Sequence, residues 1–168
     1  MAPIPYWALA LIFWLHFLAT VTWIGSLASI SLLLLPAASR ALKPPEQLAL
    51  IEAIQRRLEP VAWFSMGLLL VTGLFQLSAS PHYDGFLSTS GRWSLAILAK
   101  HSLAVVMVMV SALHTWEVLP AIRRLLMRRA NARPEELILL QRRETFLLRL
   151  NLAVGVLILA MAALARAS

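Results

Sequence analysis

The sequence has no cysteine, which excludes disulfide bonds, thiolate metal sites and thiol catalysis. Only 14% of its 168 residues are charged, whereas a typical soluble domain has about 25%. Its 6 glycines are scattered singly, so there is no glycine-rich phosphate loop. Neither an HExxH motif nor a Ser/His/Asp arrangement is present. These absences argue against an ordinary soluble enzyme, a nucleotide-binding protein and a hydrolase.

What the chain has in abundance is long apolar sequence, since 60% of its residues are hydrophobic. Four segments approach or exceed the roughly 20 residues that a membrane-spanning helix needs. They are Tyr6–Pro36, Pro60–Ser80, Trp93–Leu119 and Phe146–Ala165. The first lacks a basic leading region and is too long for a signal peptide, so we interpret it as a retained helix. We predict an all-α integral membrane protein whose four transmembrane helices form one bundle, a single domain over residues 1–168.

The positive charges predict the orientation of this bundle. A net charge of +7 could suggest nucleic acid, but most of the cations fall in two loops between apolar segments. These loops contain Arg40, Lys43, Arg56, Arg57, Arg123, Arg124, Arg128, Arg129, Arg133, Arg142 and Arg143. We place the protein in the cell (inner) membrane. By the positive-inside rule both basic loops are cytoplasmic, so both termini lie on the outer side. The expected partner of the basic surface is therefore anionic lipid rather than nucleic acid, and a docking surface for a partner protein is the alternative.

Both basic loops are expected to be partly helical. Pro44-Pro45-Glu46 opens one segment and Pro134-Glu135-Glu136 opens the other. Proline is favoured in the first helical turn because its missing N–H would be unsatisfied there anyway. An apolar stripe follows in the first segment.

The chain also contains an internal repeat. LIFWLHFLATV at Leu11–Val21 matches AILAKHSLAVV at Ala96–Val106, and LPAASRAL at Leu35–Leu42 matches LPAIRRLL at Leu119–Leu126. Further matches (PEQL with PEEL, QRR with QRR) keep the same order, at offsets of 84 to 89 residues. We predict two parallel helical-hairpin repeats, about 6–80 and 93–165, related by a pseudo-two-fold axis along the membrane normal.

The repeat makes His16 and His101 equivalent. Counted from Trp7 and Trp93, both lie roughly 12–14 Å along their helices from the outer interface. Because polar groups in a bilayer usually face the bundle interior, the pair is a candidate bis-histidine site for haem iron, copper or zinc. The alternative is two isolated histidines that bond a backbone carbonyl or a hydroxyl. Lys100 either extends its ammonium toward water or serves as a counter-ion or proton-transfer group.

A second candidate face lies on the third apolar segment. Lys100, Met107, Ser111 and His114 fall on one stripe, because fourteen helical steps return almost to the starting face. His114 has no histidine counterpart in the first repeat, so a second bis-histidine site is not expected. A metal-ligand role for His114 is the alternative to structural pairing with Glu117, Arg149 or Asn151.

Three methionines and one loop histidine complete the candidates. Met66 and Met107, together with Met109 on the same segment as Met107, carry thioethers compatible with copper(I), although methionines in apolar helices more often fill the core. His82 lies in the outer loop, where a solvated side chain is expected and a metal entry site is the alternative.

Three segments resemble the copper-resistance D (CopD) membrane domain. They are LHFLATVTWIGSLASISLLLLPA (Leu15–Ala37), RRLEPVAWFSMGLLLVTGLFQL (Arg56–Leu77) and WSLAILAKHSLAVVMVMVSAL (Trp93–Leu113). The resemblance implies copper uptake or resistance, with His16 and Lys100 as functional positions. A more distant similarity to HemJ-type four-helix haem proteins implies haem b at the same two positions.

Three functions remain open at this point. In the first, His16 and His101 ligate one b-type haem from opposite sides, and the protein transfers electrons to or from quinone or a partner subunit of a larger complex. In the second, the same histidines hold copper near the outer face, while Met107, Met66 and His114 mark a route inward. The third is a structural membrane subunit without a cofactor. We place haem first, because it explains the symmetric pair with the fewest assumptions.

Overall fold

The computed structural model describes residues 5–80, 91–127 and 134–167, and all regular structure in these ranges is helical. The helices form four long rods, three of which are divided or bent but none of which is broken. The first rod comprises α1 (Tyr6–Ala28), η1 (Ser29–Leu34) and α2 (Leu35–Ala41), and the second is α3 (Pro44–Ser78). The third comprises α4 (Arg92–Leu113), η2 (His114–Val118) and α5 (Leu119–Met127), and the fourth is α6 (Pro134–Ala167).

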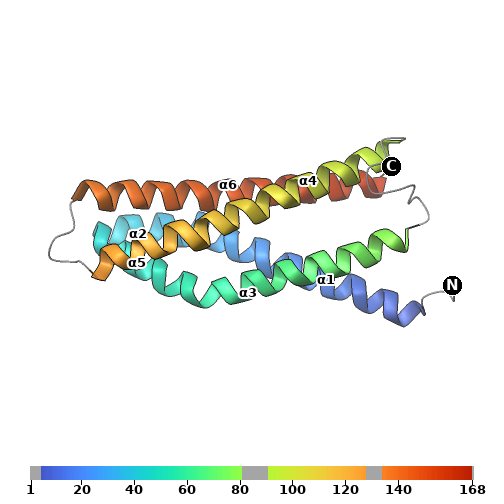
Figure 1. Cartoon of the computed structure of the whole chain (residues 1–168), viewed down its shortest axis with the longest axis horizontal. Coiled ribbons are helices and arrows are strands. Elements are labelled where there is room, and N and C mark those ends of the chain that lie inside the picture. Colours follow the sequence, from blue (N-terminus) through green and yellow to red (C-terminus); the bar gives the residue numbers. More distant parts are fainter. Residues whose placement is uncertain (1–4, 81–90, 128–133, 168) are drawn as a thin grey trace.

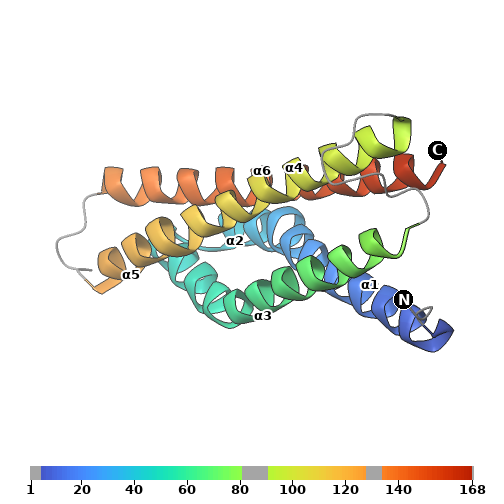
Figure 2. The same ribbon diagram turned by 45° about the vertical axis from the view of Figure 1, so that its right-hand side comes forward.

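The four rods run side by side along the length of the molecule (Figures 1 and 2). Both ends of the chain lie at one end, which we call the terminal end. The junction of α2 with α3 and the end of α5 lie at the opposite end, which we call the basic end. The most extensive contacts join α1 to α3 and α4 to α6, so each half of the chain forms a helical hairpin.

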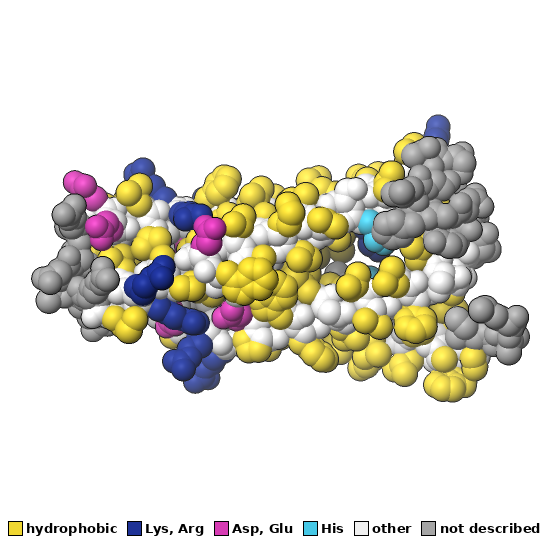
Figure 3. All heavy atoms as spheres, viewed as in Figure 1, with side chains coloured by type: hydrophobic (Ala, Val, Ile, Leu, Met, Phe, Trp, Pro, Cys, Tyr) yellow, Lys and Arg dark blue, Asp and Glu magenta, His cyan; other side chains and the backbone are white. Residues whose placement is uncertain are grey.

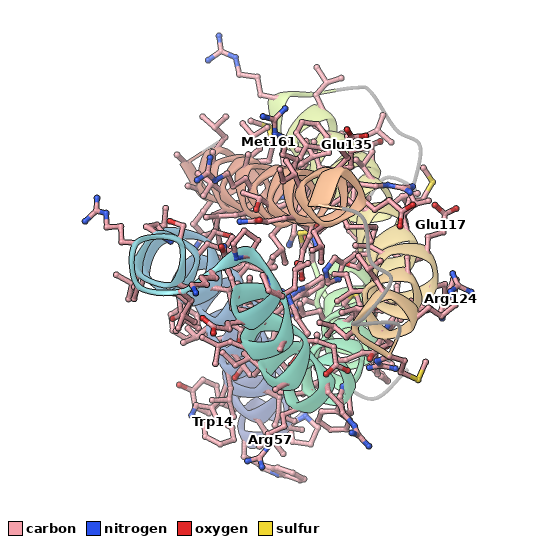
Figure 4. The ribbon with its side chains drawn as sticks, turned by 90° about the vertical axis from the view of Figure 1, so that its left-hand side faces the viewer. Trp14, Arg57, Glu117, Arg124, Glu135 and Met161 are labelled. Atoms are coloured by element: carbon pink, nitrogen blue, oxygen red, sulfur yellow. The ribbon has the colours of Figure 1, made fainter. Side chains whose placement is uncertain are left out.

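The surface of the middle of the bundle is apolar. Large side chains such as Trp14 (60% exposed) and Phe64 (71% exposed) point away from the core, and charged side chains gather at the basic end (Figure 3). Viewed from the basic end, Trp14, Arg57, Arg124 and Glu135 project from the periphery (Figure 4). Such a surface is unfavourable in water and suited to lipid. All four rods are long and apolar enough to span a bilayer, which confirms the prediction of a four-helix membrane bundle.

The helices extend beyond the predicted spans toward the basic end. The second span was expected to begin at Pro60, but α3 begins at Pro44 and continues through Pro60. A proline inside a helix removes one hydrogen bond, and the turns on both sides can maintain the helix despite that loss. At 1.5 Å per residue the 35 residues of α3 measure about 52 Å, against about 30 Å of hydrocarbon. The predicted helical starts at Pro44 and Pro134 are both found, and their first turns extend past the apolar layer.

Two wide turns occur at corresponding points of the two hairpins. In η1 the Leu35 N–H donates to the Ile30 carbonyl, and in η2 the Leu119 N–H donates to the His114 carbonyl. Both bonds span five residues, as in a π-helix, and each directly precedes a proline, Pro36 or Pro120. Because proline has no N–H and its ring collides with the carbonyl four residues before it, a widened turn relieves the clash. The same local geometry therefore recurs in each predicted repeat.

The core lies between the hairpins and is closely packed. Its buried apolar residues include Trp23, Met66, Met107, Leu148 and Val154, which come from all four rods. Gly155 allows α6 to approach its neighbours, because a Cβ placed there would lie 3.5 Å from Ile24 Cγ1 and 3.7 Å from Met107 Sδ. This layer is an apolar partition between the polar groups of the terminal half and those of the basic half.

Candidate metal-binding site

His16 is oriented by a residue of the neighbouring helix. Its Nδ1 lies 2.8 Å from the Thr72 hydroxyl of α3, and that hydroxyl lies 2.6 Å from the Leu68 carbonyl. A carbonyl can only accept, so the single hydroxyl hydrogen goes to Leu68 and Thr72 accepts from His16. The imidazole therefore carries its proton on Nδ1 and its free lone pair on Nε2, the nitrogen that could bind a metal.

His101 has the same protonation pattern as His16, but its hydrogen-bond acceptor belongs to its own helix. Its Nδ1 lies 2.7 Å from the Ile97 carbonyl one turn earlier in α4. Because that oxygen can only accept, Nδ1 again carries the proton and Nε2 is the ring's acceptor. Metal-ligating histidines characteristically donate their second ring nitrogen to such a carbonyl or hydroxyl group. Both imidazoles thus carry the proton on Nδ1 and the lone pair on Nε2.

Lys100 lies close enough to His16 to act on its ring electrostatically. The lysine side chain is partly buried, as are both imidazoles. Space-filling Figure 3 shows histidine and cationic side chains within a hollow toward the terminal end of the visible face. The structure thus brings His16 and Lys100 together from the two hairpins. The pairing of His16 with His101 on one metal stays a prediction, because α1 packs mainly on α3 and α4 mainly on α6.

The predicted stripe on α4 faces α6 and forms three successive contacts with it. The Met107 sulfur lies near Gly155, and the Asn151 amide donates to the Ser111 hydroxyl at 2.8 Å. His114 Nε2 lies 3.7 Å from Glu144 Oε1. The stripe therefore runs from the apolar partition into a polar region in the basic half.

Two of the structural partners expected for His114 bond to other residues instead. Glu117 is exposed and pairs with Arg143 at 2.5 Å, while Asn151 pairs with Ser111. The wide turn of η2 adds a residue to one helical turn, which rotates Glu117 outward relative to a regular helix and leaves His114 buried. The carboxylate that His114 faces is instead Glu144.

Glu144 and Thr72 are the residues that reasoning from the sequence missed. Glu144 was placed in a basic loop, yet it is fully buried on α6. Its signal was the helical spacing of the side chains that α6 buries, which are Glu144, Leu147, Leu148, Asn151 and Val154. Thr72 had no local signal, because its contact with His16 depends on the packing of α3 against α1.

The acidic and imidazole groups are too dispersed to form a preformed cage. Among residues 5–80, 91–127 and 134–167, no group of three or more His, Asp or Glu side chains converges on one point. A cavity of about 50 Å³ lies beside His114, and an open groove of about 550 Å³ follows α6. Neither is lined by His16 or His101, so neither would place a haem between them. His82 lies outside the described residues.

These features define an integral membrane four-helix bundle with ligand-type histidines on two of its helices. The family profile of Copper resistance protein D (CopD) matches residues 52–165. The chain belongs to this family. No curated protein and no solved structure matches the chain.

The matched region includes Lys100, His101, Met107, His114 and Glu144, whereas α1 and His16 lie before it. The CopD resemblance is thereby confirmed for the later helices. The match adds no support to the HemJ resemblance. Family membership favours copper, which we placed second, over the haem that we placed first.

Proposed function

We propose that this protein transfers copper through its four-helix bundle, with His16 and His101 as the metal-binding residues of the terminal half. The observation that carries the proposal is the shared protonation of the two imidazoles. Thr72 and Ile97 each accept from Nδ1, so each ring has Nε2 as its ligand atom. Membership of the CopD family supports copper as the metal.

Lys100 makes this site suited to passage rather than storage. Its ammonium acts electrostatically on His16 from the opposite hairpin. A copper ion bound to the imidazole is repelled by that charge, which lowers its residence time. A resident metal centre would instead surround the ion with neutral or anionic groups. Copper is therefore the cargo of this site and not a permanent cofactor.

The route toward the basic end passes the two buried methionines. Met66 and Met107 belong to the apolar partition, where they supply the only polarizable donor type that an apolar layer can hold without a large desolvation cost. Beyond them lie His114 and the polar region of the basic half. We place the basic end in the cytoplasm and the terminal end outside, by the distribution of Lys and Arg.

The test is copper uptake by proteoliposomes that contain a copper(I) chelator. The wild type is expected to accumulate copper, and His16→Ala and His101→Ala to lower the rate about tenfold or more, as expected when a ligand is lost. Ser102→Ala is the matched control, because the Ser102 hydroxyl bonds the Leu98 carbonyl one position along from His101 and offers no ligand. Uptake that is unaffected by both histidine variants would overturn the proposal.

A visible spectrum of the purified protein separates the copper and haem interpretations. The protein produced with ample haem is expected to be colourless after dithionite reduction. A reduced b-type α-band that disappears in both His16→Ala and His101→Ala would contradict copper transfer and establish haem ligation instead.

A further inference from the structure

A small cavity in the basic half is surrounded by all four rods. It measures about 50 Å³ and is lined by residues that include Gln55, Met66, His114 and Asn151. By the general relation between cavity volume and water occupancy, this is room for one metal ion with a small number of waters. The cavity lies beyond the apolar partition from His16 and is distinct from the site described above.

Three buried polar residues lie in or next to this cavity: His114 and Asn151 line it, and Glu144 lies next to His114. His114 (8% exposed), Glu144 (0%) and Asn151 (5%) are each more than nine-tenths buried. His114 Nε2, both carboxylate oxygens of Glu144 and Asn151 Oδ1 have no hydrogen-bond partner within the described part of the chain. The 3.7 Å between His114 Nε2 and Glu144 Oε1 exceeds hydrogen-bond length.

The arrangement has an excess of acceptors over donors. The amide of Asn151 is held by its Nδ2–H bond to Ser111, which leaves Oδ1 as the free acceptor. The two oxygens of Glu144 and Asn151 Oδ1 are three unpaired acceptors, whereas the unpaired amide donor of the cavity wall is Gln55 Nε2. A buried carboxylate that receives no hydrogen bond is strongly unfavourable. A cation placed among these atoms would neutralise the carboxylate and satisfy the remaining lone pairs.

We propose that His114, Glu144 and Asn151 form a second cation-binding site that receives a transition-metal ion, with Met66 of the same cavity wall as an additional soft donor. Imidazole nitrogen and thioether sulfur distinguish this donor set from the all-oxygen sites of magnesium and calcium. That the ion is copper rests on the proposed function. The existence of the site rests on the unpaired buried polar atoms of His114, Glu144 and Asn151.

Glu59 links this cavity to the basic end. Its side chain lines the cavity, and its carboxylate lies 3.7 Å from the Arg123 guanidinium of α5. Arg123 also donates to Glu52 at 2.8 Å, so it joins α5 to α3. A cation in the cavity competes with Arg123 for Glu59, which gives the bound metal an exit toward the basic end.

The experiment counts copper(I) bound to the full-length protein in lipid nanodiscs, titrated against a chromophoric copper(I) chelator. The wild type is expected to bind two ions per chain, and Glu144→Gln and His114→Ala to bind one. His16→Ala is expected to lose the other ion and keep the inner one. Thr115→Val is the matched control, because Thr115 lines the same cavity and supplies none of the unpaired atoms; it is expected to retain both ions.

Glu144→Gln keeps the size and hydrogen-bonding ability of the side chain, so this variant remains informative where His114→Ala does not fold. Binding of a single ion, lost only in His16→Ala, would overturn the second site and leave the proposed function intact. Two ions retained in both Glu144→Gln and His114→Ala would also overturn it, with waters as the occupants of the cavity. A wild type that binds no copper would overturn both proposals.

Discussion

The Nδ1–H of His16 donates to the hydroxyl oxygen of Thr72 across the interface between α1 and α3. Thr72 is 4% exposed and its own hydrogen is held by the Leu68 carbonyl, so it acts only as an acceptor toward the imidazole. Gly73, the next residue, lies beneath the ring, because a Cβ built there would be 3.5 Å from His16 Cε1. The α3 surface thus fixes both the rotation and the tautomer of a residue on α1.

Removing the Thr72 acceptor is expected to weaken copper binding by about tenfold, the lower end of the usual effect of groups that orient a metal ligand. Thr72→Val keeps the shape of the side chain but leaves the His16 Nδ1–H without an acceptor, so the other tautomer becomes accessible. Thr72→Ser retains the hydroxyl and is expected to bind as the wild type does. Competition with a chromophoric copper(I) chelator measures the copper affinity of both variants. Equal affinities of Thr72→Val and Thr72→Ser would contradict the role of the Thr72 hydroxyl in orienting His16.

Lys100 is expected to weaken copper binding at His16, so its neutralisation should strengthen that binding. As a general scale, at an effective dielectric of about 20 a unit charge about 10 Å from a bound cation opposes binding by about 1.7 kcal/mol, or more than tenfold. Lys100→Met should therefore bind copper(I) more tightly and release it more slowly, whereas Lys100→Arg keeps the charge and should behave as the wild type. Weaker binding in Lys100→Met would show instead that the lysine supports the site.

The four spans could be predicted because the length and apolarity of a membrane helix are properties of the local sequence. The helix ends were less predictable. Pro60 reads as a boundary, but flanking turns bonded on both sides maintain α3 through it. Pro36 and Pro120 are accommodated by widened turns, which no local sequence pattern predicts.

The candidate functional residues, too, could be predicted only where the local sequence marks them. His16, His101 and Lys100 could be identified from rarity and repeat position, because polar side chains in apolar helices are few. Their hydrogen-bond partners could be found only in part, since the Ile97 carbonyl is in the same helix while Thr72 depends on packing between helices. Glu144 was misplaced because a continuous α6 carries its buried face into a segment that charge alone marks as a loop.

At Gly155 the size of a substituted side chain decides whether the protein becomes more or less stable. An alanine Cβ would lie at ordinary contact distance from Ile24 and Met107, so Gly155→Ala should stabilise the helix by up to about 1 kcal/mol. A leucine cannot fit between these neighbours, and Gly155→Leu should lower stability by about 1–3 kcal/mol.

The thermal unfolding midpoint of the detergent-purified protein measures both Gly155 variants. Gly25 provides a matched control, because a Cβ there meets nothing within 4 Å. Gly25→Leu is expected to unfold at or above the wild-type temperature. A similar loss in Gly25→Leu and Gly155→Leu would show that the effect arises from the helix itself and not from contact with Met107.

The orientation in the membrane can be tested cleanly because the chain has no cysteine of its own. Ser78 at the end of α3 and Ser39 in α2 are exposed at the terminal end and the basic end respectively. Serine to cysteine changes little but the reactivity of the side chain. A membrane-impermeant maleimide should label Ser78→Cys in intact cells or spheroplasts and label Ser39→Cys only after permeabilisation.

The charge distribution gives the reason for this expectation, since basic segments beside a span are retained on the cytoplasmic side. The unsubstituted protein is the background control and should not react. Labelling of Ser39→Cys alone in intact cells would show that the orientation is the opposite one. His16 and Lys100 would then lie toward the cytoplasm, and the cavity beside His114 would be the first site that copper reaches from outside. Equal labelling of both positions would contradict a single orientation and with it a directed route through the bundle.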